Sequence, residues 1–169
     1  MNTSTHSKLI SFIWSIADDC LRDVYVRGKY RDVILPMVVL RRLDALLEPS
    51  KEAVMEEVAF QRDEAKFTEF DENGLRQASG YVFYNTSAWT LQRIFNNATN
   101  NQQILLANVE DYLNGYSSNV KEIIDKFKLK SQVRHMASKD VLLIVLEKFT
   151  PPSINLTPFE KLDPHGCNH

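Results

Sequence analysis

The chain has 169 residues, a net charge of −2 and 44% hydrophobic residues, values that are ordinary for a soluble globular protein. The near-neutral charge excludes a basic protein that coats DNA, so any contact with nucleic acid must come from a local patch. Only five glycines and six prolines argue against a barrel or a sandwich, which needs many tight turns. The length fits one compact domain with a sizeable core, and we expect an all-α, multi-helix fold.

Residues 24–49 form the stretch around which we expect the other helices to pack. Basic residues flank an apolar centre at residues 34–40, which predicts a helix over residues 30–48 that is buried on several sides. Pro36 must either kink this helix or occupy a first turn, and the apolar pattern on both sides favours a kink. Before it, apolar residues at helical spacing predict an amphipathic helix over residues 7–21 and not an export signal.

The two cysteines and the hydropathy pattern both fit a cytoplasmic protein. Cys20 falls at a core position of the first helix and Cys167 lies near the end of the chain, so a disulfide framework is not expected. No apolar run reaches the length that crosses a membrane.

An acidic segment follows the central stretch. Between residues 51 and 76 there are eight acidic residues and four basic ones, beside a narrow apolar stripe. We interpret this segment as a helix that starts after Pro49 and Ser50 and has one solvated face, in preference to an acidic binding site.

Residues 80–90 interrupt the helical pattern with an aromatic run of strand character, so we expect a short extended or strand segment near residues 80–85. A single short strand cannot stand alone, which predicts a minor pairing or an extended packed segment. The aromatic residues could stack on bases, but at this density they more often belong to a core. They are Tyr81, Phe83, Tyr84 and Trp89.

After residue 90 the apolar spacing is helical again. It predicts one helix around residues 91–95, a second around residues 104–113 that Gly115 closes, and a third that Ser117 or Ser118 caps.

The end of the helical region is expected near Phe149. Ser138 is the predicted cap of the last helix, which two prolines stop. The expected division is therefore a helical domain over residues 1–150 and a poorly structured tail over residues 151–169.

No catalytic motif is complete in this chain. The glycine-rich nucleotide-binding patterns are absent. Residues 150–153 are similar to the Asn/Asp-Pro-Pro-aromatic loop of adenine-N6 methyltransferases, but Thr150 replaces the acceptor and Ser153 replaces the aromatic ring. We interpret this tetrapeptide as a helix stop.

The other titratable residues do not predict a catalytic or metal site either. Asp18 and Asp19 are adjacent on a helix, point about 100° apart and do not converge on one proton. His135 lies in a basic run and is interpreted as a surface residue. The H-x-C-x-H set at the end of the chain has no fourth ligand nearby, so no metal site is expected there. Its members are His165, Cys167 and His169.

Two groups of basic residues are the remaining candidates for a site, with double-stranded DNA as the ligand. The first group surrounds Gly28, and the second lies in a run without acidic residues. A phosphate-binding surface needs several cations on one face, so the fold must bring these residues together; the alternative is solvated charge. The groups are Arg27, Lys29 and Arg31, and Lys126, Lys128, Lys130 and Arg134.

Arg41 and Arg42 adjoin the apolar centre of the central stretch. We expect them to pair with Asp44, Glu48 or a partner domain, and we do not count them with the candidate DNA-binding residues.

Four segments carry a resemblance to a known family. They are FIWSIADDCLR…YRDVILPMVVLRRLDALLEP, FYNTSAWTLQRI, NVEDYLNGYSSNVKEIIDKFKLKSQV and ASKDVLLIVLEKF. In this order, over about residues 8–158, the chain resembles the N-terminal domain of the modification (methylase, M) subunit of type I restriction-modification systems.

The resemblance implies a helical domain that precedes a Rossmann-like catalytic domain, which uses S-adenosylmethionine to methylate adenine N6. It implies double-stranded DNA, one specificity subunit, a second M subunit and a motor restriction subunit as partners. The cofactor motif and the catalytic loop should lie downstream, and the similarity decays over residues 162–169. We therefore expect no catalytic, cofactor-binding or metal-binding residue in this chain, and no activity of the chain by itself.

Two hypotheses on function stay open at this point. In the first, the domain clamps DNA through the basic groups. In the second, it is a protein-interaction module that docks on the specificity subunit or on the second M subunit, and its contact with DNA is incidental.

Overall fold

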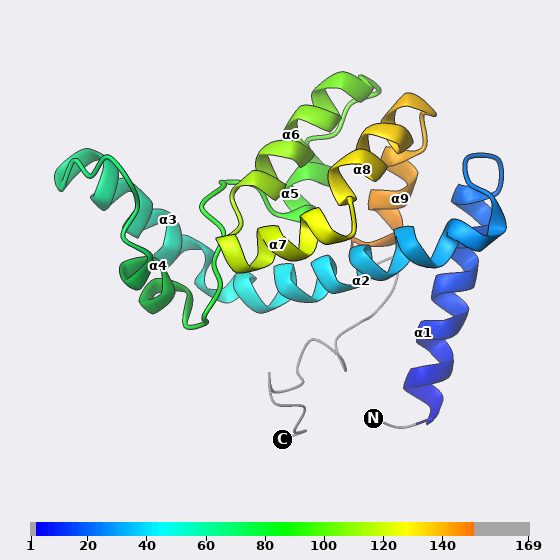
Figure 1. Ribbon diagram of the computed structural model, residues 1–169, viewed down its shortest axis with the longest axis horizontal. Coiled ribbons are helices and arrows are strands. Elements are labelled where there is room, and N and C mark those ends of the chain that lie inside the picture. The colour runs from blue at the N-terminus through cyan, green and yellow to red at the C-terminus, as the bar shows by residue number, and fades with distance from the viewer. Residues whose placement is uncertain (1–2, 151–169) are drawn as a thin grey trace.

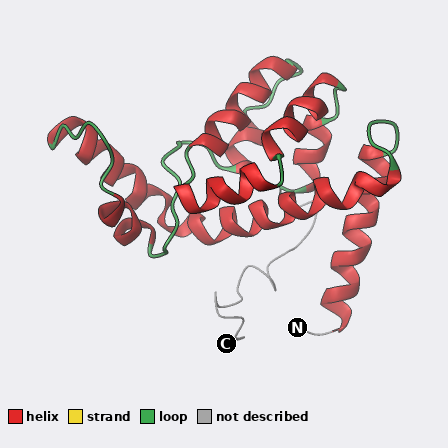
Figure 2. Ribbon diagram, in the orientation of Figure 1, coloured by secondary structure: helices red, strands yellow, loops and turns green. Residues whose placement is uncertain are grey.

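The computed structural model describes residues 3–150, and this part of the chain is helical and without a strand (Figures 1 and 2). The helices are α1 (Thr3–Ile16), α2 (Tyr30–Leu47), α3 (Lys51–Ala59), α4 (Glu72–Ser79), α5 (Leu91–Asn96), α6 (Gln102–Asn114), α7 (Ser118–Lys126), α8 (Leu129–Ser138) and α9 (Leu142–Lys148). Short π-helical turns, η1 (Ala17–Leu21) and η4 (Phe60–Glu64), and 3-10 turns, η2 (Arg27–Lys29) and η3 (Glu48–Ser50), extend them. The all-α prediction is confirmed for the described residues.

Helix α2 has the central position that its sequence predicts. Figure 1 shows it running along the base of the body formed by α5 to α9, with α7 beside it. Pro36 lies buried inside the helix and not in its first turn. Burial on several sides is only partly right, because Leu35 and Val39 remain 38% and 41% exposed. The side chains that α2 gives to the main core are Val33, Ile34, Met37, Leu40 and Leu47.

Helix α1 packs against the end of the described chain. The ring of Phe12 meets the ring of Phe149 edge-on, with 5.4 Å between their centroids. Cys20 is buried, as the sequence predicts for a core position of the first helix. That helix begins earlier than expected and ends in the π-helical turn η1.

Residues 51–80, here called the arm, extend away from the body at the C-terminal end of α2 (Figure 1). The prediction of one helix over residues 51–76 is wrong, because the chain leaves the helical conformation after Glu64 and resumes it at Glu72. The reversal depends on Lys66, which adopts a left-handed φ of 53° that glycine normally supplies. No glycine marks this turn in the sequence.

A buried glutamine holds the two halves of the arm together. The Gln61 side-chain oxygen accepts a hydrogen bond from the Asp71 backbone N–H at 2.7 Å, and its amide donates to the Asp71 carbonyl at 3.1 Å. Asp71 in turn caps α4 by accepting from the Asn73 N–H. Val54, Val58 and Leu75 of the arm form a small separate core, and Tyr84 of the following segment packs into it.

The segment after the arm is extended, as predicted, and its strand character is limited to one antiparallel bridge between Asn85 and Tyr116. The Thr86 N–H donates to the Gly115 carbonyl at 2.8 Å, and the Ser117 N–H donates to the Tyr84 carbonyl at 2.9 Å. These bonds are the minor pairing that a lone extended segment needs.

The aromatic run belongs to the core and is not an open platform for bases. Tyr84 is 7% exposed, and Tyr81, Phe83 and Trp89 pack, partly buried, against the main core. The rings of Tyr81 and Phe83 stack on each other with centroids 5.1 Å apart.

The last two described helices divide differently from the prediction. Ser138 is the final residue of α8, where its hydroxyl donates to the His135 carbonyl at 2.7 Å, and it does not cap the next helix. Asp140 turns the chain with a left-handed φ of 60°, and α9 starts after Val141. The expectation that the last helix ends near Phe149 is confirmed. The expected tail, residues 151–169, lies outside the described residues.

Candidate nucleic-acid interface

The first basic group lies at the start of α2. Lys29 occupies the N-cap position and Arg31 lies in the first turn, and both are exposed. The side chain of Arg27, the third member, lies outside the described ones. Asp32 in the same turn offsets part of the positive charge.

The loop before this group packs on α8. The Tyr25 hydroxyl donates to the Gln132 carbonyl at 3.3 Å, and its ring meets the His135 ring edge-on at 5.0 Å. Burial raises the pKa of Tyr25 to about 12, so the phenol stays neutral at physiological pH. His135, which we expected on the surface, is half-buried and has its Nε2 3.3 Å from the Val24 carbonyl oxygen.

The second basic group begins at the junction between α7 and α8. Lys126 is the last residue of α7, and Lys128 is the N-cap of α8 in a left-handed conformation with φ of 52°. Both side chains are exposed. Within residues 3–150 neither makes a hydrogen bond or an ion pair.

The other two members of the second group hold α8 against α6. Lys130 Nζ donates to Asn114 Oδ1 at 2.5 Å, and Arg134 Nε donates to Glu110 Oε1 at 2.9 Å. Their charges therefore already have protein acceptors, and Lys126 and Lys128 are the members of the group left for an external ligand.

Antiparallel packing of α7 on α2 determines how the two groups lie relative to each other. Helix α7 lies beside α2 and runs in the opposite direction, so the C-terminus of α7 approaches the N-terminal half of α2 (Figure 1). The two helices are neighbours, because side chains of both, such as Pro36 and Ile124, line the same small recess. The structure thus places the junction of α7 and α8, with its two exposed lysines, beside the helix that Lys29 and Arg31 begin.

A buried polar junction lies toward the C-terminal end of α2, and the sequence predicts only part of it. Arg41 pairs with Asp44 at 3.9 Å, as expected. The Tyr112 hydroxyl donates to Asp44 Oδ1 at 2.8 Å and lies 2.5 Å from the Tyr116 hydroxyl, and the Leu91 N–H donates to the same carboxylate at 3.2 Å.

Burial and hydrogen bonding have opposite effects on the pKa of the Asp44 carboxyl group. Burial raises the pKa of Asp44, while the Tyr112 hydroxyl, the Leu91 N–H and Arg41 oppose that rise. Burial also raises the pKa of Tyr112 and Tyr116 well above the usual value. The sequence signal was a lone aspartate between Leu40 and Leu47 on the buried face of α2.

Lys51 joins the arm to this junction. Its Nζ lies 3.5 Å from the Asn85 carbonyl, and only 6% of the residue is exposed. Burial lowers the pKa of Lys51 to about 8. Beside it lies a cavity of about 10 Å³ that Asp44, Asn85 and Tyr116 help to line, which is room for about one water molecule.

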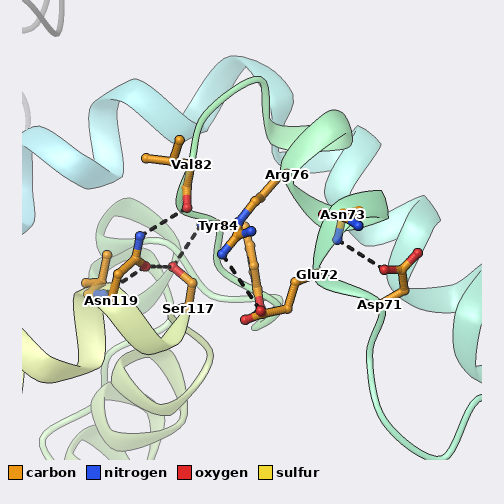
Figure 3. Close-up of polar contacts among 9 residues, drawn as sticks. Asp71, Glu72, Asn73, Arg76, Val82, Tyr84, Ser117 and Asn119 are labelled. Carbon is orange, nitrogen blue, oxygen red and sulfur yellow. Dashed lines mark hydrogen bonds and ion pairs between the residues drawn. The ribbon is translucent and has the colours of Figure 1, made fainter.

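A second set of polar contacts links the segment after the arm to α7 and to the arm (Figure 3). The Ser117 hydroxyl, at the predicted cap position of α7, accepts from the Tyr84 N–H at 3.2 Å and does not cap the helix. Asn119 Nδ2 donates to the Val82 carbonyl at 3.0 Å. On the arm side, the Tyr84 hydroxyl donates to Glu72 at 3.0 Å, and burial raises the pKa of Tyr84 to about 12. Arg76 completes the set with an ion pair to Glu72 at 3.7 Å.

The remaining sequence candidates do not form a site in the described part of the chain. Asp19 accepts from the Ser15 hydroxyl at 3.3 Å and lies 3.9 Å from Lys148, and the side chain of Asp18 lies outside the described ones. Among the described residues no group of histidine, cysteine, aspartate or glutamate could hold a metal ion. Residues 165–169 and the two prolines after Thr150 lie outside the described residues.

A protein-family model, the HsdM N-terminal domain, matches residues 9–149. The chain belongs to this family. As an HsdM N-terminal domain it is part of a type I restriction-modification methylase subunit, as the resemblance implied. Comparison with curated proteins gave no match, and comparison with solved structures gave none. Among the described helices none is long and apolar enough to span a membrane.

Proposed function

We propose that this domain binds double-stranded DNA within a type I methylase complex and helps to hold the enzyme on it. The observation that carries the proposal is the pair of exposed lysines at the junction of α7 and α8, which have no acceptor within residues 3–150. The junction that carries Lys126 and Lys128 lies beside α2, the helix that Lys29 and Arg31 begin. Cations gathered in this way attract the DNA backbone and release its counterions.

The start of α2 supports the same ligand. Its helix dipole places partial positive charge at the end where Lys29 and Arg31 lie, and no side chain caps its first N–H groups. Phosphate is the anion that helix N-termini commonly accept in proteins. Contacts of this kind position a duplex without reading its sequence, so base recognition would belong to the specificity subunit.

The catalytic chemistry belongs elsewhere in the proposed assembly. The glycine-rich nucleotide-binding patterns are absent from this sequence. We therefore assign the cofactor and the methylation of adenine N6 to other parts of the methylase subunit. In the proposed complex a specificity subunit, a second methylase subunit and a restriction subunit accompany this domain in the cytoplasm.

Charge reversal at the two exposed lysines tests the proposal. We expect Lys126→Glu/Lys128→Glu to weaken binding to duplex DNA at least tenfold and to lower the salt dependence by about two phosphate contacts. Lys130 stays unchanged, because its bond to Asn114 makes it part of the packing. The measurement is fluorescence anisotropy of a labelled duplex at several salt concentrations.

The matched control reverses two exposed lysines elsewhere, Lys8→Glu/Lys139→Glu, with the same change in net charge. It should bind DNA nearly as the unaltered domain does. Equal loss of affinity in the two variants would mean that only the overall charge matters and would overturn the assignment.

A second candidate function is docking on another subunit. The observation in its favour is the partly exposed apolar surface of α2 and α7, including Val39 and Ile123, at 41% each. The same charge-reversal variant separates the two functions. DNA binding lost with assembly intact supports the clamp, whereas assembly with the specificity subunit lost and DNA binding intact supports the docking module.

A further inference from the structure

An exposed aromatic ring lies between the two exposed lysines at the junction of α7 and α8. Phe127 follows Lys126 directly and precedes Lys128, and 40% of the residue is exposed to solvent. Among the exposed aromatic residues in the described part of the chain, it is the one with a basic residue on both sides. The others are Trp14, Phe60, Phe67 and Phe70.

The backbone of the junction holds this ring and the two lysines in one short turn. Helix α7 ends at Lys126 and α8 begins at Leu129, so Phe127 and Lys128 form the whole link. The Phe127 N–H donates to the Ile123 carbonyl at 3.1 Å, and Lys128 turns the chain with its left-handed φ of 52°. Leu129, which is 2% exposed, then anchors the chain in the main core. The three exposed side chains therefore belong to a turn that is fixed at both ends.

The start of α2 has the same order of residue types but no available ring. Tyr30 lies between Lys29 and Arg31, as Phe127 lies between its two lysines. The Tyr30 side chain packs, partly buried, against the main core, whereas Phe127 is exposed. The first basic group can therefore offer cations alone, and the second offers cations with an aromatic face.

Cations beside an exposed aromatic ring are the combination that binds unpaired nucleotides. The ammonium groups attract the phosphates, and the ring stacks on the flat face of a base. Inside a duplex every base is already stacked between its neighbours, so a ring on the protein finds a free base only where pairing is interrupted. Because the phenylalanine side chain has no hydrogen-bonding group, it meets the face that all bases share and does not distinguish one base from another.

We propose that the junction of α7 and α8 binds a nucleotide whose base is unpaired, with Phe127 stacked on the base and Lys126 and Lys128 on the neighbouring phosphates. The inference rests on the proposed function, because the same two lysines must contact DNA. It adds a preference between DNA structures. A duplex that contains an unpaired base binds more tightly than a fully paired duplex with the same number of phosphates.

Fluorescence anisotropy with two labelled duplexes at one low salt concentration tests this preference. One duplex is fully paired, and in the other a single thymine faces an abasic site. The unaltered domain should bind the second duplex about fivefold more tightly or better, as stacking on one base provides. Phe127→Leu keeps an apolar side chain without a flat ring, so it should lose the preference and still bind the paired duplex. Phe127→Tyr restores a ring and should keep the preference.

The matched control is Phe67→Leu, the same change at a phenylalanine that is 50% exposed in the acidic arm. This variant should keep the preference, and equal loss in the two leucine variants would overturn the assignment to Phe127. A wedge inserted between base pairs is a different contact, which leucine also provides. A preference that survives in Phe127→Leu would therefore overturn stacking.

Photocrosslinking locates the contact without any substitution. When 5-iodouracil replaces the unpaired thymine, irradiation should attach the DNA to the peptide that contains Phe127, which mass spectrometry identifies. Attachment only to other peptides, or equal affinity of the unaltered domain for the two duplexes, would overturn this inference and leave binding to the DNA backbone intact. No binding to either duplex at low salt would overturn the proposed function together with it.

Discussion

At the scale of the residue, Gly115 shows a constraint that its sequence context does not reveal. The spacing suggests a glycine that ends a helix, and it does follow α6, but its φ of −75° is open to any residue. What requires glycine is the close approach of the segment after the arm. A Cβ at this position would collide with Asn85 Oδ1 and would lie 2.6 Å from the Ser87 backbone nitrogen.

We therefore expect Gly115→Ala to lower the free energy of unfolding by roughly 1–3 kcal/mol, as overpacking does in cores. The Asn85 side chain cannot move away easily from a Cβ at position 115, because Asn85 is buried and its Oδ1 already accepts a hydrogen bond from the Ser87 N–H at 2.7 Å. Urea denaturation measures the effect. Gly28→Ala is the matched control, since nothing lies within 4 Å of a Cβ there. Equal stability of the two variants would contradict the close-approach explanation.

At the scale of the element, the sequence predicts helices well and their ends poorly. The helices α2, α5, α6 and α7 follow from apolar spacing, because packing one face on a core imposes a helical period. The unexpected breaks occur where Lys66 and Asp140 adopt left-handed conformations that glycine usually marks. Lysine rarely adopts that conformation, so Lys66 gives no local signal of a break, whereas aspartate at position 140 adopts it more readily.

The candidate site shows the same limit. The basic groups could be predicted from charge alone. Which of their side chains form hydrogen bonds within the domain could not be predicted. Lys130 and Arg134 find Asn114 and Glu110 only because α8 packs on α6, a contact between residues far apart in the sequence. The buried junction around Asp44 depends likewise on three distant segments meeting.

The attachment of the arm to the body should depend on pH through Lys51. Its pKa is about 8 in the folded protein against 10.5 for an exposed lysine, so between these values the unfolded chain binds a proton that the folded chain does not. The free energy of unfolding contributed by this group therefore rises with pH from about 8 to 10.5. Below that window, burial of the charged ammonium lowers stability.

The variant Lys51→Met removes this titration and keeps the side-chain volume. Relative to the variant, the unaltered protein should gain roughly 1–3 kcal/mol of stability between pH 7 and pH 10. Urea denaturation of both proteins at several pH values measures the difference, and the comparison cancels the tyrosines, which titrate in both. Parallel stability curves for the two proteins would show that Lys51 keeps an ordinary pKa.

At the scale of the whole molecule, charge is divided between an acidic arm and a more basic remainder. The arm extends from the C-terminal end of α2 (Figure 1), Lys29 and Arg31 lie at the start of that helix, and the junction that carries Lys126 and Lys128 lies beside it. In the proposed function, a duplex would contact these cations and not the acidic arm. The near-zero net charge of the chain is therefore compatible with a local attraction for phosphate.

The most direct test of this account is the salt dependence of duplex binding by the unaltered domain. Fluorescence anisotropy of a labelled duplex should show binding at low salt, with the logarithm of the association constant falling linearly with the logarithm of salt concentration. Four phosphate contacts, from Lys29, Arg31, Lys126 and Lys128, predict a slope of about −3 to −4. No binding at low salt, or binding with a slope near zero, would contradict the claim that this domain grips the DNA backbone.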